Sequence, residues 1–317
     1  MDITLARAIA GFRLSNEAAG LSNATISWYE SNLRLFLQWF QVELAHEPNL
    51  ADLTGDMIRK YLMQLRTQEQ CFQDHPYHPE EQRTVAPRTI QAYYSSLSAF
   101  CNWAVREELL AVSPVKNVPR PKVPRYMPDP FNEEEIRALL KACKTLTDKS
   151  GTRMVAMLLC LLDTGVRVGE LLSLKLADVE LDLGRARVMG KGSKERYVFF
   201  GKATKRALWR YISLARSEPR LKVENLFLSF DGRPLQYRRF ADRLRELGKR
   251  AGVENVHPHR FRRTAAVQFL RNGGDLLSLQ KLLGHESLEM VRRYVELAVD
   301  DVADAHRKAS PVDAWRL

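Results

Sequence analysis

The segment His257-Pro258-His259-Arg260-Phe261-Arg262-Arg263-Thr264 decides how the chain is interpreted, because it sets a histidine and an arginine at helical spacing. Pro258 suits the first turn of a helix, since proline has no backbone N–H to leave unbonded there. His259 and Arg262, three residues apart, then share one face of that helix. His257 and His259 are also candidate metal ligands, but no cysteine or carboxylate accompanies them at ligand spacing, so we expect no metal site.

Two glycine-containing motifs upstream each present a basic side chain at a turn. In Thr164-Gly165-Val166-Arg167-Val168-Gly169-Glu170-Leu171, Gly165 ends a helix, the chain reversal aims Arg167, and Glu170 lies within one helical turn. In Gly190-Lys191-Gly192-Ser193-Lys194-Glu195-Arg196, the two glycines let a hairpin tip approach a phosphate backbone closely. We expect Lys194 and Arg196 to position phosphates. Taken singly, the first motif also fits a surface Arg–Glu pair, and the second fits an ordinary basic hairpin tip.

A third motif lies downstream, where Leu282-Leu283-Gly284-His285 is followed nine residues later by Tyr294. Gly284 is placed to cap a helix and to present His285 at its end. A second short helix, from Ser287 onward, carries Tyr294 directly after Arg292 and Arg293. A tyrosine on a helix face is usually a core residue, so this motif also decides nothing by itself.

Together these motifs supply the parts needed to break a phosphodiester bond without a metal. Negative charge grows on the non-bridging oxygens, and the planar fork of arginine pairs with two oxygens at once. A nucleophile must lie in line with the leaving oxygen, and the leaving 5′ oxygen needs an acid. A phenol is a poor nucleophile at neutral pH, and two guanidinium groups beside it favour phenolate-like charge.

The ordered set Arg167, Lys191, His259-x-x-Arg262, His285 and Tyr294 resembles the tyrosine recombinase (phage integrase) family, close to its Xer-like simple recombinases. The resemblance spans roughly residues 5–310, and six matching positions in order are highly specific where each motif alone is weak. It implies two domains, an α-helical core-binding (SAM-like) domain and a mixed catalytic domain. It also implies a cyclic tetramer on DNA.

The resemblance implies a role for each matching residue. Tyr294 attacks the scissile phosphate and forms a 3′-phosphotyrosyl enzyme with a free 5′-hydroxyl. The other roles are a clamp on the non-bridging oxygens by Arg167 and Arg262, general acid catalysis by Lys191, proton transfer at the tyrosine by His259, a hydrogen bond to the phosphate from His285, and support of the arginine by Glu170. Arg263 stands where many members have a second histidine, and we expect altered packing or an added phosphate contact there.

Hydrophobic spacing predicts an all-α first domain over residues 1–112. Helices are expected over residues 3–19, after the N-cap Ser22, after Thr54 and from Pro87, with a polar stretch over 73–86. Residues 113–130 hold six of the fourteen prolines and predict an extended linker. Its basic residues, expected to lie along a phosphate backbone, are Lys116, Arg120, Lys122 and Arg125.

The remaining chain predicts a mainly α catalytic domain over residues 131–298 with a small antiparallel sheet. Helices are expected at roughly 133–145 and 151–164, strands at 179–183, 186–189 and 196–200, and helices again from Lys202. Residues 299–317 predict a last helix over 299–309 and a tail that contains Trp315. Trp315 near the end of a polar tail favours docking on its own or a neighbouring subunit over the alternative of a frayed terminus.

Charge and composition narrow the function classes. The 317 residues carry a formal charge of +11, and residues 185–263 alone hold 22 Lys and Arg against 7 Asp and Glu. Such a basic block is typical of a polyphosphate partner, although a solvated basic face gives the same count. The four cysteines are scattered, which favours a reducing cytoplasm over a disulfide framework. We find no signal peptide and no membrane-spanning run, and expect no membrane partner.

The sequence therefore predicts a site-specific recombinase that cuts and rejoins double-stranded DNA at a recombination site through a Holliday junction. We expect a homotetramer on DNA, or an assembly with a partner recombinase, and no cofactor, because the phosphotyrosine conserves the bond energy. A type IB topoisomerase or hairpin telomere resolvase would share the chemistry. A non-catalytic DNA-binding regulator would share only the fold.

Overall fold

The computed structural model describes residues 3–67, 70–71, 81–82, 84–123, 129–146, 148–190, 194–220, 222–285, 287–298, 310 and 312. The chain divides into two compact units, Met1–Tyr126 and Met127–Leu317. The fold is mainly helical with a small antiparallel sheet in the second unit, as the sequence predicts. None of the helices in these residues is long and apolar enough to cross a bilayer.

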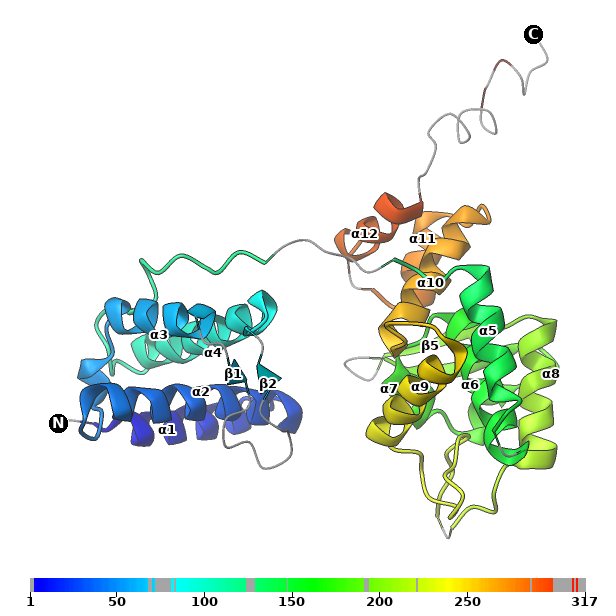
Figure 1. Ribbon diagram of the computed structural model, residues 1–317, viewed down its shortest axis with the longest axis horizontal. Coiled ribbons are helices and arrows are strands. Elements are labelled where there is room, and N and C mark those ends of the chain that lie inside the picture. Colours follow the sequence, from blue (N-terminus) through cyan, green and yellow to red (C-terminus); the bar gives the residue numbers. More distant parts are fainter. Residues whose placement is uncertain are drawn as a thin grey trace. The chain divides into compact units, whose positions relative to one another are not determined.

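The described part of the N-terminal unit contains four α-helices, drawn in blue to cyan in Figure 1. They are α1 (Leu5–Ala18), α2 (Asn23–Leu44), α3 (Gly55–Thr67) and α4 (Pro87–Arg106), with a short 3-10 turn η1 (Leu50–Asp52) between α2 and α3. Ser22 caps α2 by accepting a hydrogen bond from the Thr25 N–H at 3.2 Å, and Pro87 opens α4. The buried rings of Phe36, Phe40 and Phe100 form the centre of this unit.

A short pair of strands in this unit differs from the sequence prediction. Strands β1 (Gln70–Cys71) and β2 (Glu81–Gln82) pair antiparallel, so the unit is not entirely α-helical. These two-residue strands are too short to give a periodic signal.

The first half of the proline-rich segment packs on the N-terminal unit. Val115 and Val118, three residues apart, are buried in its core, and Tyr94 donates a hydrogen bond to the Val118 carbonyl at 3.0 Å. Proline content predicts an extended chain, but these two valines supply enough apolar surface to fix it. Lys116, Arg120 and Lys122 remain exposed, while Arg125 lies outside the described residues.

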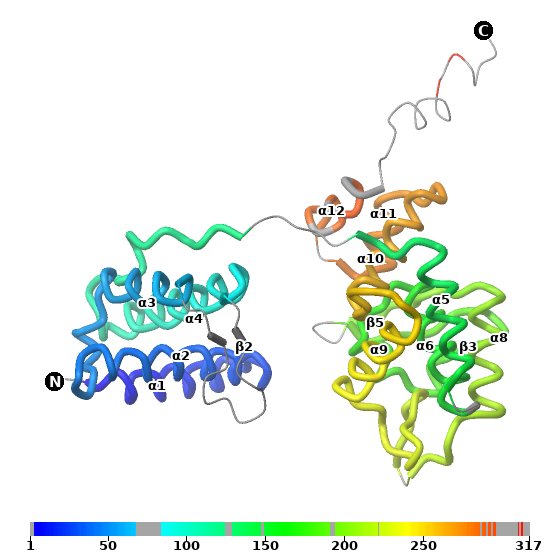
Figure 2. The backbone as a smooth tube through the Cα atoms, viewed as in Figure 1, coloured from blue at the N-terminus to red at the C-terminus, as the bar shows by residue number. Residues whose placement is uncertain are grey.

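The second unit surrounds α6 (Asp148–Thr164), which packs against α5 (Glu133–Cys143), α8 (Lys202–Arg210) and α10 (Pro258–Arg271). The backbone trace in Figure 2 shows α6 between α8 and α10. The sheet has the order β3 (Val179–Glu180), β4 (Arg185–Met189), β5 (Glu195–Phe199), all antiparallel. The other elements are α7 (Val168–Ser173), a 3-10 turn η2 (Leu176–Asp178), a π-helical turn η4 (Tyr211–Ala215), α9 (Tyr237–Ala251), α11 (Leu276–Leu283) and α12 (Glu289–Ala298).

Helices α10, α11 and α12 form the end of this unit that carries the last motifs of the sequence. Ala266, Leu279, Leu283 and Val291 make a small core between them, and Tyr294 packs against it. Pro258 opens α10 and Gly284 ends α11 with a left-handed φ of 63°, both as predicted. Helix α12 begins at Glu289, two residues later than expected. The predicted helix over 299–309 and Trp315 lie outside the described residues.

Candidate active site

Arg167 lies at the N-terminal end of α7, where the chain turns after Gly165 at a φ of 61°. The Glu170 carboxylate accepts hydrogen bonds from the Arg167 backbone N–H at 2.8 Å and from its Nη1 at 3.1 Å. The Glu170 side chain is 6% exposed and the Arg167 side chain 37%. The buried Glu170 carboxylate therefore holds the backbone and one guanidinium nitrogen of Arg167, while the rest of this guanidinium remains open to a ligand.

Arg262, on α10, is almost fully buried and is held by three protein atoms. Its Nη1 donates to the Gly165 carbonyl at 2.6 Å, and its Nη2 contacts the Leu283 carbonyl at 2.8 Å and His285 Nε2 at 2.7 Å. Burial, followed by the nearby charge of Arg167, lowers the pKa of Arg262 to about 10. Arg262 stays charged at neutral pH, and an anion would relieve the repulsion between the two arginines.

His285 follows the Gly284 cap and is neutral at physiological pH. Burial lowers its pKa to about 4, with further contributions from Arg262, Arg167 and Arg196. A guanidinium cannot accept a hydrogen bond, so His285 Nε2 is the acceptor from Arg262 and its proton is on Nδ1. That Nδ1 is buried and has no hydrogen-bond partner among the described residues. The ring thus keeps one N–H to donate.

His259 lies one turn before Arg262 on α10 and is exposed. Burial of its ring nitrogens, then the charges of Arg262, Arg263 and Arg167, lowers its pKa. His259 is therefore a neutral imidazole beside the arginines, which is the state that accepts a proton. Arg263, the next basic residue on the helix, is half-buried.

Tyr294 belongs to the same cluster. Its ring centroid is 6.1 Å from that of His285. Its hydroxyl is close enough to Arg262 to raise the pKa of that guanidinium. It projects from α12, which packs on α10 and α11 (Figure 1). One chain therefore brings its own tyrosine to its own arginines.

The three basic residues predicted in the hairpin, Lys191, Lys194 and Arg196, differ in where the structure places them. Lys191 lies outside the described residues, so the structure does not place it. Lys194 is exposed, in a position open to a phosphate. Arg196, expected to contact a phosphate, instead points inward: its Nη1 and Nη2 donate to the two oxygens of Glu170 at 3.0 and 2.8 Å. Attraction to the buried Glu170 carboxylate explains why Arg196 points inward. Burial disfavours the charged form of Glu170, and the hydrogen bonds and charges of Arg196 and Arg167 together outweigh this and lower its pKa.

Sequence reasoning missed Arg260, which holds residues 129–135 at the start of the second unit against α10. Its guanidinium donates to the backbone carbonyls of Asp129 and Glu254 and to both oxygens of Glu135, and it stacks 3.9 Å from the centre of the Phe131 ring. Glu135 also forms a capping box with Asn132 at the start of α5. The long-range pairing with Arg260 carries no local signal.

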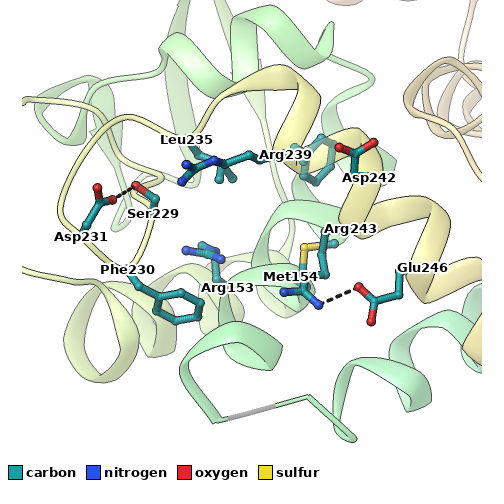
Figure 3. Close-up of a pocket in the computed structure, with 11 residues that line it drawn as sticks. Arg153, Met154, Ser229, Phe230, Asp231, Leu235, Arg239, Asp242, Arg243 and Glu246 are labelled. Atoms are coloured by element: carbon teal, nitrogen blue, oxygen red, sulfur yellow. Dashed lines mark hydrogen bonds and ion pairs between the residues drawn. The ribbon is translucent and has the colours of Figure 1, made fainter. Parts of the chain in front are cut away.

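A cavity of about 450 Å³ opens away from this cluster, between α6, α9 and residues 229–235 (Figure 3). Arg153, 7% exposed, lies in its wall, donates to the Leu228 carbonyl at 2.5 Å and packs on the Phe230 ring. No member of the candidate site lines this cavity. The arginine–histidine–tyrosine cluster, an open concentration of positive charge beside a phenol, is the better-equipped site for phosphoryl chemistry.

The two-unit helical fold with this cluster defines the class: it is that of the tyrosine recombinases, enzymes that cut and rejoin DNA. The fold is shared, at 20% identity and a TM-score of 0.69, with the XerH site-specific recombinase bound to a palindromic difH substrate, over 95% of this chain and 83% of that one.

Sequence comparison gives the family. The model of the phage integrase family matches residues 130–300. The tyrosine recombinase XerC of Staphylococcus carnosus is 34% identical over 70% of this chain and 75% of its own length. The tyrosine recombinase XerD of Listeria monocytogenes is 30% identical over 92% of this chain and 94% of its own. The chain belongs to the phage integrase family, which confirms the resemblance seen in its motifs.

Proposed function

We propose that this chain is a site-specific recombinase that uses Tyr294 to cut one strand of double-stranded DNA. The Tyr294 oxygen bonds to the scissile phosphorus, the bond from phosphorus to the 5′ oxygen breaks, and a 3′-phosphotyrosyl link replaces it. The 5′-hydroxyl of another strand then attacks this link and regenerates the tyrosine. Each step exchanges one phosphodiester for another, so rejoining needs no external energy source.

The observation that carries the proposal is the convergence of Tyr294, Arg262 and His285 within one chain, with Arg167 close enough to lower the pKa of Arg262. In the proposed mechanism Arg167 and Arg262 bind the non-bridging oxygens. His259, neutral and exposed, takes the tyrosine proton, and Glu170 holds Arg167. Lys191 is the general acid for the 5′ oxygen, an assignment that depends on its motif.

His285 has a defined task in this mechanism. Its Nε2 accepts from Arg262, and its only N–H has no acceptor among the residues that the structure describes. A bound phosphate gives Arg262 a better, charged acceptor, which frees the imidazole to reorient and donate its N–H to the same phosphate. Because its pKa is lowered to about 4, the residue acts as a neutral hydrogen-bond donor at neutral pH.

The assembly is also a proposal. We propose a tetramer on two duplexes, of this chain alone or with a second recombinase, that exchanges strands through a Holliday junction, with residues 299–317 docked between subunits. The exposed Lys116, Arg120, Lys122 and Lys194 contact the phosphate backbone, as do Arg125 and the half-buried Arg263. Support comes from the relatives XerC and XerD and from the XerH recombinase, whose structure contains its difH substrate.

The covalent adduct tests this function. A library of duplexes with a randomised central region and a nick that traps the cleaved strand is incubated with the protein, and denaturant-resistant adducts are sequenced to identify the site. We expect adducts with the wild type and none with Tyr294→Phe, which should still bind DNA. Tyr197→Phe, on β5 and away from the cluster, is the matched control. Adducts that survive in Tyr294→Phe would refute the role of this residue.

A further inference from the structure

Arg196 uses every nitrogen of its side chain to join two parts of the candidate site. It projects from β5, and its side chain is 14% exposed. Its Nη1 and Nη2 form a two-pronged pair with Glu170, and its Nε donates to the Leu282 carbonyl at 2.9 Å. Glu170 also binds the N–H and Nη1 of Arg167, so a single carboxylate orients both arginines.

The Leu282 contact fixes the turn that presents His285. The last carbonyls of a helix have no partner within the helix. At the end of α11, two successive carbonyls receive guanidinium donors: Leu282 from Arg196 at 2.9 Å and Leu283 from Arg262 at 2.8 Å. Gly284 then turns the chain, and a Cβ on it would lie 3.1 Å from Arg196 Nη1. The glycine therefore permits both the left-handed turn and the approach of Arg196.

We propose that Arg196 is a positioning residue for strand cleavage, which sets the spacing between Arg167 and His285 without touching the DNA. This inference rests on the proposed function, since it assigns Arg196 to the same phosphate site. Its planar fork reaches Glu170 along one edge while Nε reaches a backbone carbonyl on the other side. An ammonium group has a single nitrogen and cannot hold both partners in these directions.

The alternative role, a direct phosphate contact, fits the position of Arg196 less well. Glu170 neutralises its charge, and the guanidinium faces the interior of the unit. Lys194, two residues earlier, is exposed and pairs with no carboxylate among the described residues. The two roles also differ in measurable ways, because a phosphate contact contributes to the salt dependence of binding and a positioning contact does not.

The test compares Arg196→Lys with Arg185→Lys, using the best duplex recovered as a covalent adduct. Arg185 makes a similar two-pronged pair with Glu180, at 3.0 and 2.8 Å, on the neighbouring strand β4 and away from the cluster. Single-turnover adduct formation is measured against protein concentration, which separates the maximal cleavage rate from the half-saturating concentration. Binding is measured at several salt concentrations, and thermal unfolding identifies the folded samples. Gly284→Ala serves as a second variant that leaves Arg196 in the chain.

We expect Arg196→Lys to lower the maximal cleavage rate about 10- to 100-fold, as a displacement of about 1 Å at a reacting centre does, with the half-saturating concentration unchanged within about twofold. Gly284→Ala should give the same pattern, and Arg185→Lys should match the wild type. A wild-type maximal rate in folded Arg196→Lys would overturn the proposal. Arg196→Gln, measured in the same binding and cleavage assays, separates the two roles. Weaker binding with unchanged chemistry and a salt slope reduced by about one unit in this variant would also overturn the proposal, because that result assigns Arg196 to a phosphate. If the wild type itself forms no adduct, the proposed function fails, not this inference alone.

Discussion

Lowering the pH should destabilise the second unit through His285, because the folded protein resists protonation of this ring. Its pKa is lowered from 6.5 to about 4, first by burial and then by the charges of Arg262, Arg167 and Arg196. Between these two values the unfolded chain binds a proton that the folded chain does not. The free energy of unfolding therefore falls as the pH drops from about 6.5 to about 4 and loses nothing further from His285 below that.

The size of the effect follows from the same two values. At about pH 5, proton linkage gives a loss of about 2 kcal/mol relative to about pH 7.5, and solvent access to the half-buried ring reduces this to about 1 kcal/mol. Urea unfolding followed by far-UV circular dichroism, at both pH values, measures it in the wild type and in His285→Asn. The variant should lose less stability on acidification, although His257 and His259, whose pKa values are also lowered, keep part of the dependence. Parallel losses in the two proteins would show that the Arg262–His285 contact does not hold the imidazole neutral.

Three further outcomes are expected. Gly165→Ala should lower the free energy of unfolding by about 1–3 kcal/mol in urea titration, because φ is 61° and a Cβ would lie 2.7 Å from Leu283 Cδ2; an unchanged value would contradict this close packing. Arg167→Lys should retain DNA affinity in a gel-shift assay yet cleave on the order of 100-fold more slowly, since an ammonium cannot form the two-pronged contact, and comparable rates would count against the clamp. The thiols of Cys101, Cys143 and Cys160 are buried with raised pKa values, so a disulfide reagent at about pH 8 should label them at least about 100-fold more slowly in the native protein than in urea; rapid native labelling would argue against that burial.

Local rules of chain geometry account for most of the fold that was predictable. Ser22 caps α2, Pro87 and Pro258 open helices, and Gly284 closes one, because each residue type satisfies a specific backbone requirement at a helix end. The three strands of the sheet were located to within a few residues for the same reason: alternating side chains and flanking glycines leave a readable pattern. Burial of Val115 and Val118 was missed, since proline content dominated the interpretation of that segment.

The arrangement inside the site was less predictable, because it depends on partners far apart in the chain. Motif order selected Arg167, Arg262, His285 and Tyr294, and the structure brings these side chains into one cluster. The same motifs gave no indication that Arg196 faces a buried carboxylate 26 residues away and a carbonyl 86 residues away. A basic residue in a hairpin is compatible with DNA or with Glu170, and only tertiary packing decides between them.

Arg260 determines where the catalytic unit can be separated from the rest of the chain. Two of its acceptors, the carbonyls of Asp129 and Pro130, come before the residue at which the helical core begins. A fragment that started at Phe131 would keep every side chain of the candidate site but leave a buried guanidinium short of these acceptors. Limited proteolysis or recombinant truncation should therefore give a stable C-terminal piece only when the cut falls ahead of Asp129.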